Sequence, residues 1–436
     1  MSNAIKRAVS GLKAFNEKFV DIFGEKEWEE RINSYQGPYF GPKPKALWRD
    51  SEDRLFYYLG LFCSYLDRDK ELYNLFEGSR ITPVMTNFLG NFEKISLIDG
   101  FNEKFLSFIA KENSNDVDST LFEFGVAASY LKKKDYVRFI PEHPSKKTPD
   151  LEIKDGSLVY YAECKKARRG TQETYREADE WYSFSSALGT LIRECEISCH
   201  LHFDFLGKVE DVDSKSVLDI IINKLHKLVR KKITIYDVEN VIITCSPLNE
   251  NPCAANEYKY FKSDDPSFFK MLTGNYNPYF GYKLVASCKG RGHLIRQIKF
   301  ISVITRNTVN PTTIDAQVRH VKKLLVKGTE QIPEKKHGVV HILVEECQGP
   351  QFAVEQLNRN FEMLNSFVVK NRYIDHVYLH VAKSLLPLNG EFDVEETIHT
   401  FDINRPLISR NGNTAWFYTE TSEDGEGRLY SDHGLL

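Results

Sequence analysis

The sequence lacks the features by which several classes of protein are recognised. No stretch of it approaches the roughly 18 consecutive apolar residues of a membrane-spanning helix, and it does not open like a secretory signal. No cysteine pair has C-x-x-C spacing, which argues against a zinc ribbon. Neither a Gly-x-x-x-x-Gly-Lys loop nor a Gly-x-Ser-x-Gly elbow occurs. We therefore expect a cytoplasmic protein without membrane contact, whose cysteines are mostly buried, reduced thiols.

What the chain does have is length and aromatic content. Its 436 residues include 29 Phe and 22 Tyr, which indicates well-packed cores rather than disorder. A change of pattern along the chain suggests four parts. They are a helical region (1–112), a compact α/β core (113–210), an α/β extension or second α/β domain (211–385) and an acidic, irregular tail (386–436).

The predicted core has a recognisable order of elements. A helix over 119–134 precedes strands over 136–140, 150–153 and 158–165. Asp155 and Gly156 form a tight-turn pair between the last two strands, which predicts a hairpin. A helix over 172–195 and a strand over 199–205 complete the order helix, three strands, helix, strand.

The net charge of −3 hides an uneven distribution. Segment counts give about +8 for residues 121–340, about −8 for 341–436 and about −3 for 1–120. Basic runs are often only solvated helix faces, but here the basic segment also encloses clustered carboxylates. Carboxylates for a metal ion and cations for phosphate are the two components that a nuclease needs together.

The carboxylates lie on the predicted hairpin. Asp150 follows Pro149 at the start of one strand, and Glu163 and Lys165 share one face of the other because side chains alternate on a strand. Glu123 stands inside an apolar run of the preceding helix, where a carboxylate needs a partner. Two or three such carboxylates suit Mg²⁺, and a neighbouring lysine can position or deprotonate a metal-bound water.

With these residues the sequence resembles the PD-(D/E)xK nuclease superfamily, whose fold is called restriction-endonuclease-like. The resemblance covers roughly 118–206. It implies Asp150, Glu163 and Glu123 as ligands of Mg²⁺ or Mn²⁺, Lys165 as the catalytic lysine and Glu123 as the accessory acid. The RecB-like branch has a Gln-x-x-x-Tyr pattern on the next helix, but here Gln172 and Tyr175 stand one position too close.

Several basic residues are expected to contact the DNA backbone. Lys166, Arg168 and Arg169 follow the catalytic lysine, and Lys289 and Arg291 lie in a predicted hairpin turn that could equally be only a solvated loop. The primary hypothesis is therefore a metal-dependent endonuclease acting on DNA, for which the resemblance suggests restriction or anti-phage defence. The flanking regions would then supply target recognition, homodimer contacts or binding of a regulatory partner protein.

Other interpretations of the same residues stay open. The fold could have kept nucleic-acid or scaffold binding without catalysis, or the enzyme could cleave RNA. Glu163 and Lys165 could simply pair on a solvent face. Glu152 shares the strand face of Asp150 and is a rival ligand. A zinc site at Cys195, Cys199, His200 and His202 is disfavoured, because their spacing fits no common site.

Overall fold

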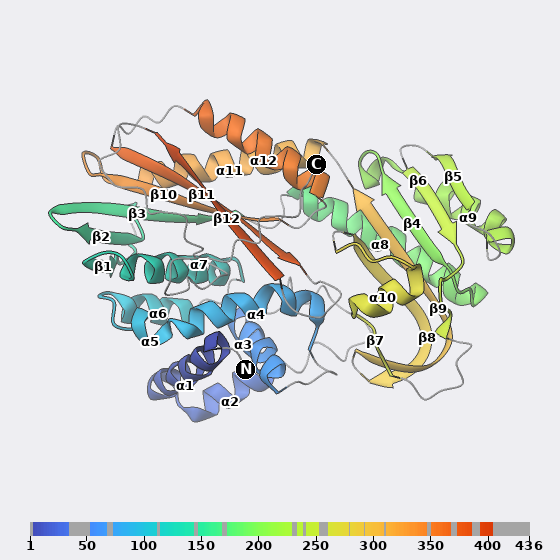
Figure 1. The fold of residues 1–436 in the computed structure, drawn as a ribbon, viewed down its shortest axis with the longest axis horizontal. Coiled ribbons are helices and arrows are strands. Elements are labelled where there is room, and N and C mark those ends of the chain that lie inside the picture. Colours follow the sequence, from blue (N-terminus) through green and yellow to red (C-terminus); the bar gives the residue numbers. More distant parts are fainter. Residues whose placement is uncertain are drawn as a thin grey trace.

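A computed structural model supplies the three-dimensional structure of the chain. It describes residues 3–34, 53–67, 73–110, 114–143, 147–167, 172–228, 233–238, 241–252, 260–278, 280–291, 293–308, 311–346, 350–367, 373–385 and 393–403. These residues form a mixed α/β protein with a helical N-terminal region and two mixed sheets (Figure 1).

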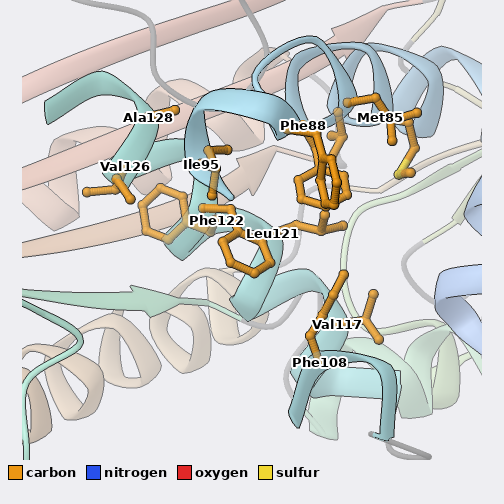
Figure 2. Close-up of a cluster of buried hydrophobic side chains, with 14 of the residues drawn as sticks. Met85, Phe88, Ile95, Phe108, Val117, Leu121, Phe122, Val126 and Ala128 are labelled. Carbon is orange, nitrogen blue, oxygen red and sulfur yellow. The ribbon is translucent and has the colours of Figure 1, made fainter. Parts of the chain in front are cut away.

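The helical character expected for the N-terminal region is confirmed. Its helices are α1 (Asn3–Phe23), α2 (Glu25–Ser34), α3 (Arg54–Leu66), α4 (Leu75–Gly90), α5 (Phe92–Ile95) and α6 (Phe101–Ala110). Their apolar faces meet in an aromatic core, in which Phe15 packs on Phe88, Phe92 and Phe105. The same core takes in α7 (Ser114–Leu131), whose Phe124 stacks on Phe88 with ring centres 5.4 Å apart; Figure 2 shows part of this core.

The first sheet is mixed and has the order β1-β2-β3-β10-β11-β12 among the described residues. Its strands are β1 (Tyr136–Phe139), β2 (Leu151–Asp155), β3 (Leu158–Lys166), β10 (Gly338–Glu346), β11 (Ile374–Leu385) and β12 (Asp393–Asp402). The central strands β3, β10 and β11 run parallel, and the outer pairs are antiparallel. β3 therefore lies inside the sheet, between the hairpin partner β2 and the later strand β10.

Helices cover both faces of this sheet. α7 and the N-terminal helices lie on one face, and α11 (Pro311–Gln331) and α12 (Pro350–Asn365) lie on the other (Figure 1). Alternate residues of β10 accordingly enter different cores: Val339 and Leu343 pack toward α7, whereas Val340 and Ile342 pack toward α11. We call these the α7 face and the α11 face of the sheet.

The strand that lies beside β3 is not the one that follows it in the chain. The order helix, three strands, helix, strand is found along the chain as α7, β1, β2, β3, α8 (Gln172–Cys195) and β4 (His200–Phe205). However, β4 joins the second sheet, and β10 takes the place beside β3, with Val340 opposite Glu163. β10 is buried on both faces, as a central parallel strand requires, whereas β4 alternates between buried and half-exposed residues.

The second sheet belongs to a long insertion between β3 and α11. Its strands are β4, β5 (Ile233–Val238), β6 (Val241–Ser246), β7 (Phe261–Lys262), β8 (Gly281–Arg291) and β9 (Leu294–Thr308). The helices α8 and α9 (Ser214–Leu228) pack on one side, and α10 (Pro266–Thr273) packs on the other. The range 211–385, expected to be an α/β extension of the core or a second α/β domain, contributes strands to both sheets.

The tail expected to be irregular contains a regular element. Within 386–436, β12 pairs antiparallel with β11 along its whole length, and residues from 404 onward lie outside the described part. No helix in the described ranges is both long enough and apolar enough to cross a membrane.

Candidate functional site

The β2–β3 hairpin places the predicted acidic residues opposite one another. The turn uses Gly156 at φ 61°, a left-handed conformation that glycine adopts without steric cost. Leu151 pairs with Ala162, so Asp150, directly before β2, comes opposite Glu163. One Asp150 carboxylate oxygen accepts a hydrogen bond of 2.8 Å from the backbone N–H of Cys164. The expected approach of Asp150 to the Glu163 strand is therefore present.

Glu163 is the most deeply buried acidic group of the site. Its side chain is 0% exposed, and its Oε2 atom has no hydrogen-bond partner among the described residues. Burial, followed by repulsion from Asp150, raises the pKa of Glu163 well above its usual value, although Lys165 opposes the shift. The Lys165 ammonium group forms an ion pair with the other oxygen, Oε1, and remains partly exposed. Lys165 thus lies close to a buried carboxylate, Glu163, of which only one of the two oxygens has a partner among the described residues.

The third predicted acid, Glu123, comes from α7. It is buried and forms an ion pair with Lys104 of α6, whose ammonium group also lies 3.6 Å from a Glu142 carboxylate oxygen. Burial opposes the positive charge of Lys104, but the attraction of Glu123 and Asp150 prevails and raises the pKa of Lys104. Repulsion from Glu123 also contributes, more weakly, to the raised pKa of Glu163. We call Lys104, Glu123, Asp150, Glu163 and Lys165 the site cluster.

Lys104 is a member of the site cluster that the sequence reading missed. It stands at the edge of the buried stripe of its helix, about one turn from both Phe101 and Phe108. A lysine on the buried stripe of an amphipathic helix needs an anionic partner, just as the buried Glu123 does. Two opposite charges, each inside an apolar helical stretch of the sequence, could therefore have indicated that Lys104 and Glu123 pair.

α11 forms the wall of the site on the side of Glu163. Gly328 allows the helix to approach closely, because a Cβ atom there would stand 2.8 Å from Val340 Cγ1 and 3.6 Å from Glu163 Cγ. The end of α11 also holds the segment before Asp150. Gln331 donates a hydrogen bond of 3.0 Å to the Thr148 carbonyl, and Lys147 pairs with Glu330 at 2.5 Å. α11 and β10, which come much later in the chain than the hairpin, therefore also shape the site.

The site suits a divalent cation through two of its carboxylates. No three His, Cys, Asp or Glu side chains in the described ranges form a complete set of metal ligands. Mg²⁺ commonly takes only one or two protein carboxylates and keeps water and substrate oxygens as its other ligands. Asp150 and the half-satisfied Glu163 fit that requirement, and a cation beside them would offset their mutual repulsion. Glu123, the expected third ligand, is instead engaged by Lys104.

The structure does not support the expected contact of Lys166 with nucleic acid. As the neighbour of Lys165 on β3 it points to the α7 face, where its side chain is 5% exposed. It lies 3.1 Å from Asp118 and 2.9 Å from Glu345. Arg54, Arg80 and Tyr58 also contact Asp118. We call these six residues the ion-pair cluster, and its lysine is not available to a phosphate group.

The remaining predicted contacts are resolved only in part. Arg168 and Arg169 lie outside the described residues, as does the side chain of Arg291. Lys289 is exposed on β8, consistent with the expected contact but equally with a solvated hairpin.

The alternative sites are less well formed. Glu152, the rival ligand, pairs with Arg138 at 3.0 Å on the exposed edge of the sheet. The side chains of Gln172 and Tyr175 lie outside the described part. His200 and His202 both hydrogen bond to Thr305, while Cys199 is buried toward the opposite side of β4. The structure thus brings together Asp150, Glu163 and Lys165 rather than these alternatives.

Comparisons of the chain with protein-family models, curated proteins and solved structures gave no match. The functional argument therefore depends on the site cluster and its surroundings.

Proposed function

We propose that the protein is a metal-dependent endonuclease that hydrolyses phosphodiester bonds in DNA. The observation that carries the proposal is the convergence of Asp150, Glu163 and Lys165, with a buried Glu163 oxygen that lacks a hydrogen-bond partner. A purely structural hairpin would not need a carboxylate as deeply buried as Glu163 opposite a second carboxylate, because the buried group must lose its hydration.

Each residue has a distinct task in such a reaction. Asp150 and Glu163 would hold Mg²⁺ or Mn²⁺, which supplies a Lewis acid and a water of lowered pKa when bound. Lys165 lies beside Glu163 and keeps part of its surface exposed, so it can approach the attacking water or a non-bridging phosphate oxygen. A fixed ammonium group at that point stabilises the negative charge that develops on the phosphoryl group. The Cys164 N–H orients Asp150 by its hydrogen bond.

The choice of DNA depends on resemblance and on charge. The PD-(D/E)xK arrangement is typical of enzymes acting on DNA, and the basic segment 121–340 contains both β3 and the insertion. A role in restriction or anti-phage defence follows from the same resemblance. Cleavage assays in Mg²⁺, Mn²⁺ and EDTA with plasmid, linear duplex, single-stranded DNA and RNA would establish the substrate.

The test of the mechanism uses matched variants of neighbouring residues. Asp150→Ala and Lys165→Met should each reduce cleavage by about 10²–10³-fold or more, because each removes an interaction with the reacting groups. Glu152→Ala is the control, since it removes a carboxylate two residues along the strand from Asp150 but leaves the site cluster intact. Unchanged cleavage in both site variants would overturn the proposal, whereas salt-sensitive DNA binding without any cleavage would favour a catalytically inactive binding protein.

A further inference from the structure

One lysine of the insertion differs from the other lysines that the fold buries. Lys104, Lys165 and Lys166 each form an ion pair with a carboxylate. Lys283, on β8, is half-buried, and no carboxylate forms an ion pair with it in the described part of the chain. A cation that has lost part of its hydration without gaining an anion lacks a favourable partner.

The surroundings of Lys283 are polar and come from one helix. Its ammonium group lies 3.0 Å from both the Ser185 and the Ser186 hydroxyl oxygens of α8. It also lies 5.2 Å from the centre of the Tyr182 ring. Ser185 is buried and donates its proton to the Tyr182 carbonyl, whereas Ser186 is partly exposed and can donate to an incoming group. The serines therefore position the lysine without neutralising it.

The charged side chain that acts on Lys283 has the same sign. Burial, followed by repulsion from Arg193 of α8, lowers the pKa of Lys283 to about 8. Arg193 is exposed, and its guanidinium group lies near Gly189, on the side of α8 that faces Val285 of β8. Two cations and a hydroxyl donor thus share the edge between α8 and β8, and an anion there would relieve the repulsion between the cations.

We propose that Lys283, Ser186 and Arg193 bind a backbone phosphate of the nucleic-acid substrate. This inference builds on the proposed nuclease function and locates a contact for the strand outside the site cluster. Lysine, arginine and serine are the side chains that most often contact phosphate oxygens. Tyr182 is 56% exposed beside them and offers a ring on which a base can stack.

The position of α8 connects this contact with the catalytic strand. α8 begins shortly after Lys166, the last residue of β3, and carries Tyr182, Ser186 and Arg193 along its length into the second sheet (Figure 1). A strand that follows α8 from the hairpin would reach Lys283. The insertion would thereby contribute to substrate binding rather than to the chemistry.

The test measures binding by the full chain in which Glu163→Gln blocks cleavage. Fluorescence anisotropy in EDTA with labelled single-stranded and duplex DNA, over a salt series, compares Lys283→Gln with Lys283→Arg. Lys283→Gln should weaken binding about five- to tenfold and lower the salt slope by about 0.7–0.9, the contribution of one phosphate contact. Lys283→Arg should retain binding within about twofold. Lys299→Gln is the control, because that exposed β9 lysine already pairs with Glu196.

A second measurement separates failure of the inference from failure of the proposed function. Inorganic phosphate should raise the Tm of the protein with Lys283 but not of the Lys283→Gln variant. Nucleic-acid binding that is unchanged in Lys283→Gln overturns the inference and leaves the nuclease proposal intact. Phosphate stabilisation through Lys283 without any nucleic-acid binding supports the anion site and counts against the nuclease. If neither ligand binds through Lys283, the inference is wrong.

Discussion

Two clusters of buried charge lie around the same strand, and they differ in how well their charges are balanced. β3 directs Glu163 and Lys165 to its α11 face and Lys166 to its α7 face. In the ion-pair cluster, Lys166, Arg80 and Arg54 outweigh the burial of Asp118, and the pKa of Asp118 is lowered. In the site cluster, burial and Asp150 outweigh Lys165, and the pKa of Glu163 is raised.

The difference indicates which cluster serves the fold and which serves a ligand. The ion-pair cluster joins α3, α4 and α7 to the ends of β3 and β10, and its charged form is the stable one. In the site cluster, the charged form of Glu163 is unfavourable until a proton or a metal ion binds to it. Removing a charge from the ion-pair cluster should therefore weaken the protein, whereas removing the charge of Glu163 from the site cluster should strengthen the metal-free protein.

The largest effect is expected from Lys166→Met. The substitution leaves Asp118 and Glu345 with less positive charge in a buried place, and breaking such a pair costs about 3–5 kcal/mol. Denaturant unfolding, followed by circular dichroism, measures the loss. Lys154→Met, an exposed change on β2, is the control and should alter stability by less than about 0.5 kcal/mol. A loss of the same small size in Lys166→Met would mean that the ion-pair cluster does not stabilise the fold.

Magnesium should stabilise the protein through the site cluster alone. At a free concentration of about 100 times Kd, binding to the folded state adds about 2.7 kcal/mol to the free energy of unfolding. The gain should be larger at pH 8 than at pH 5, because the cation competes with the proton that a raised pKa keeps on Glu163. Thermal unfolding with Mg²⁺ or EDTA tests this, and the gain should vanish in Asp150→Ala but not in Glu152→Ala. Equal stabilisation of both variants would place the metal elsewhere.

Glu163→Gln should abolish cleavage and yet stabilise the metal-free protein. The amide keeps the shape of the side chain without the charge, and we expect a gain of about 1–2 kcal/mol near neutral pH. Denaturant unfolding in EDTA measures it.

The pH dependence of that gain follows from the direction of the pKa shift. Below about pH 4.5, the ordinary pKa, both states hold the proton and the variant gains nothing. As the pH rises toward the raised folded pKa, the unfolded chain releases the proton first, so the wild type loses stability that the glutamine variant keeps. A gain that is independent of pH between 4 and 8 would contradict the assignment of Glu163 as the strained carboxylate.

The hairpin of the site could be predicted from the sequence because its determinants are local. Asp155 and Gly156 set the turn, and the period of two along β3 assigns Glu163 and Lys165 to one face. The partner of Glu123 was not local, because Lys104 lies on another helix. Lys104 and Glu123 could have been considered as a pair because both stand in apolar stretches, but no rule of sequence spacing relates residues on separate helices.

The neighbour of β3 could not be predicted from the order of elements. β4 and β10 both follow a helix, and only sheet pairing distinguishes them. A signal was nevertheless present in the composition of the two strands. Residues 339–344 of β10 form an almost continuous apolar run, typical of a central parallel strand, whereas β4 alternates with His200, His202 and Asp204. The composition of β10, unlike that of β4, thus matches the burial that the central position requires.

The smallest effect is expected from Lys104→Met, which tests whether the positive charge of Lys104 lowers the affinity of the site cluster for a metal ion. Removing Lys104 takes a positive charge away from Glu123 and Asp150, so Mg²⁺ or Mn²⁺ should bind about three- to tenfold more tightly, or about 0.6–1.4 kcal/mol. Without metal the same variant should be less stable, because Glu123 stays buried without its lysine. Calorimetric titration with Mn²⁺ measures affinity and stoichiometry together, and Lys94→Met, an exposed lysine of α5, is the control with the same change of charge. Weaker metal binding by Lys104→Met would contradict this expectation. It would show that Lys104 holds Glu123 in a position that supports the metal. Lys104 would then stabilise its surroundings, as the cations of the ion-pair cluster do, instead of opposing the bound cation.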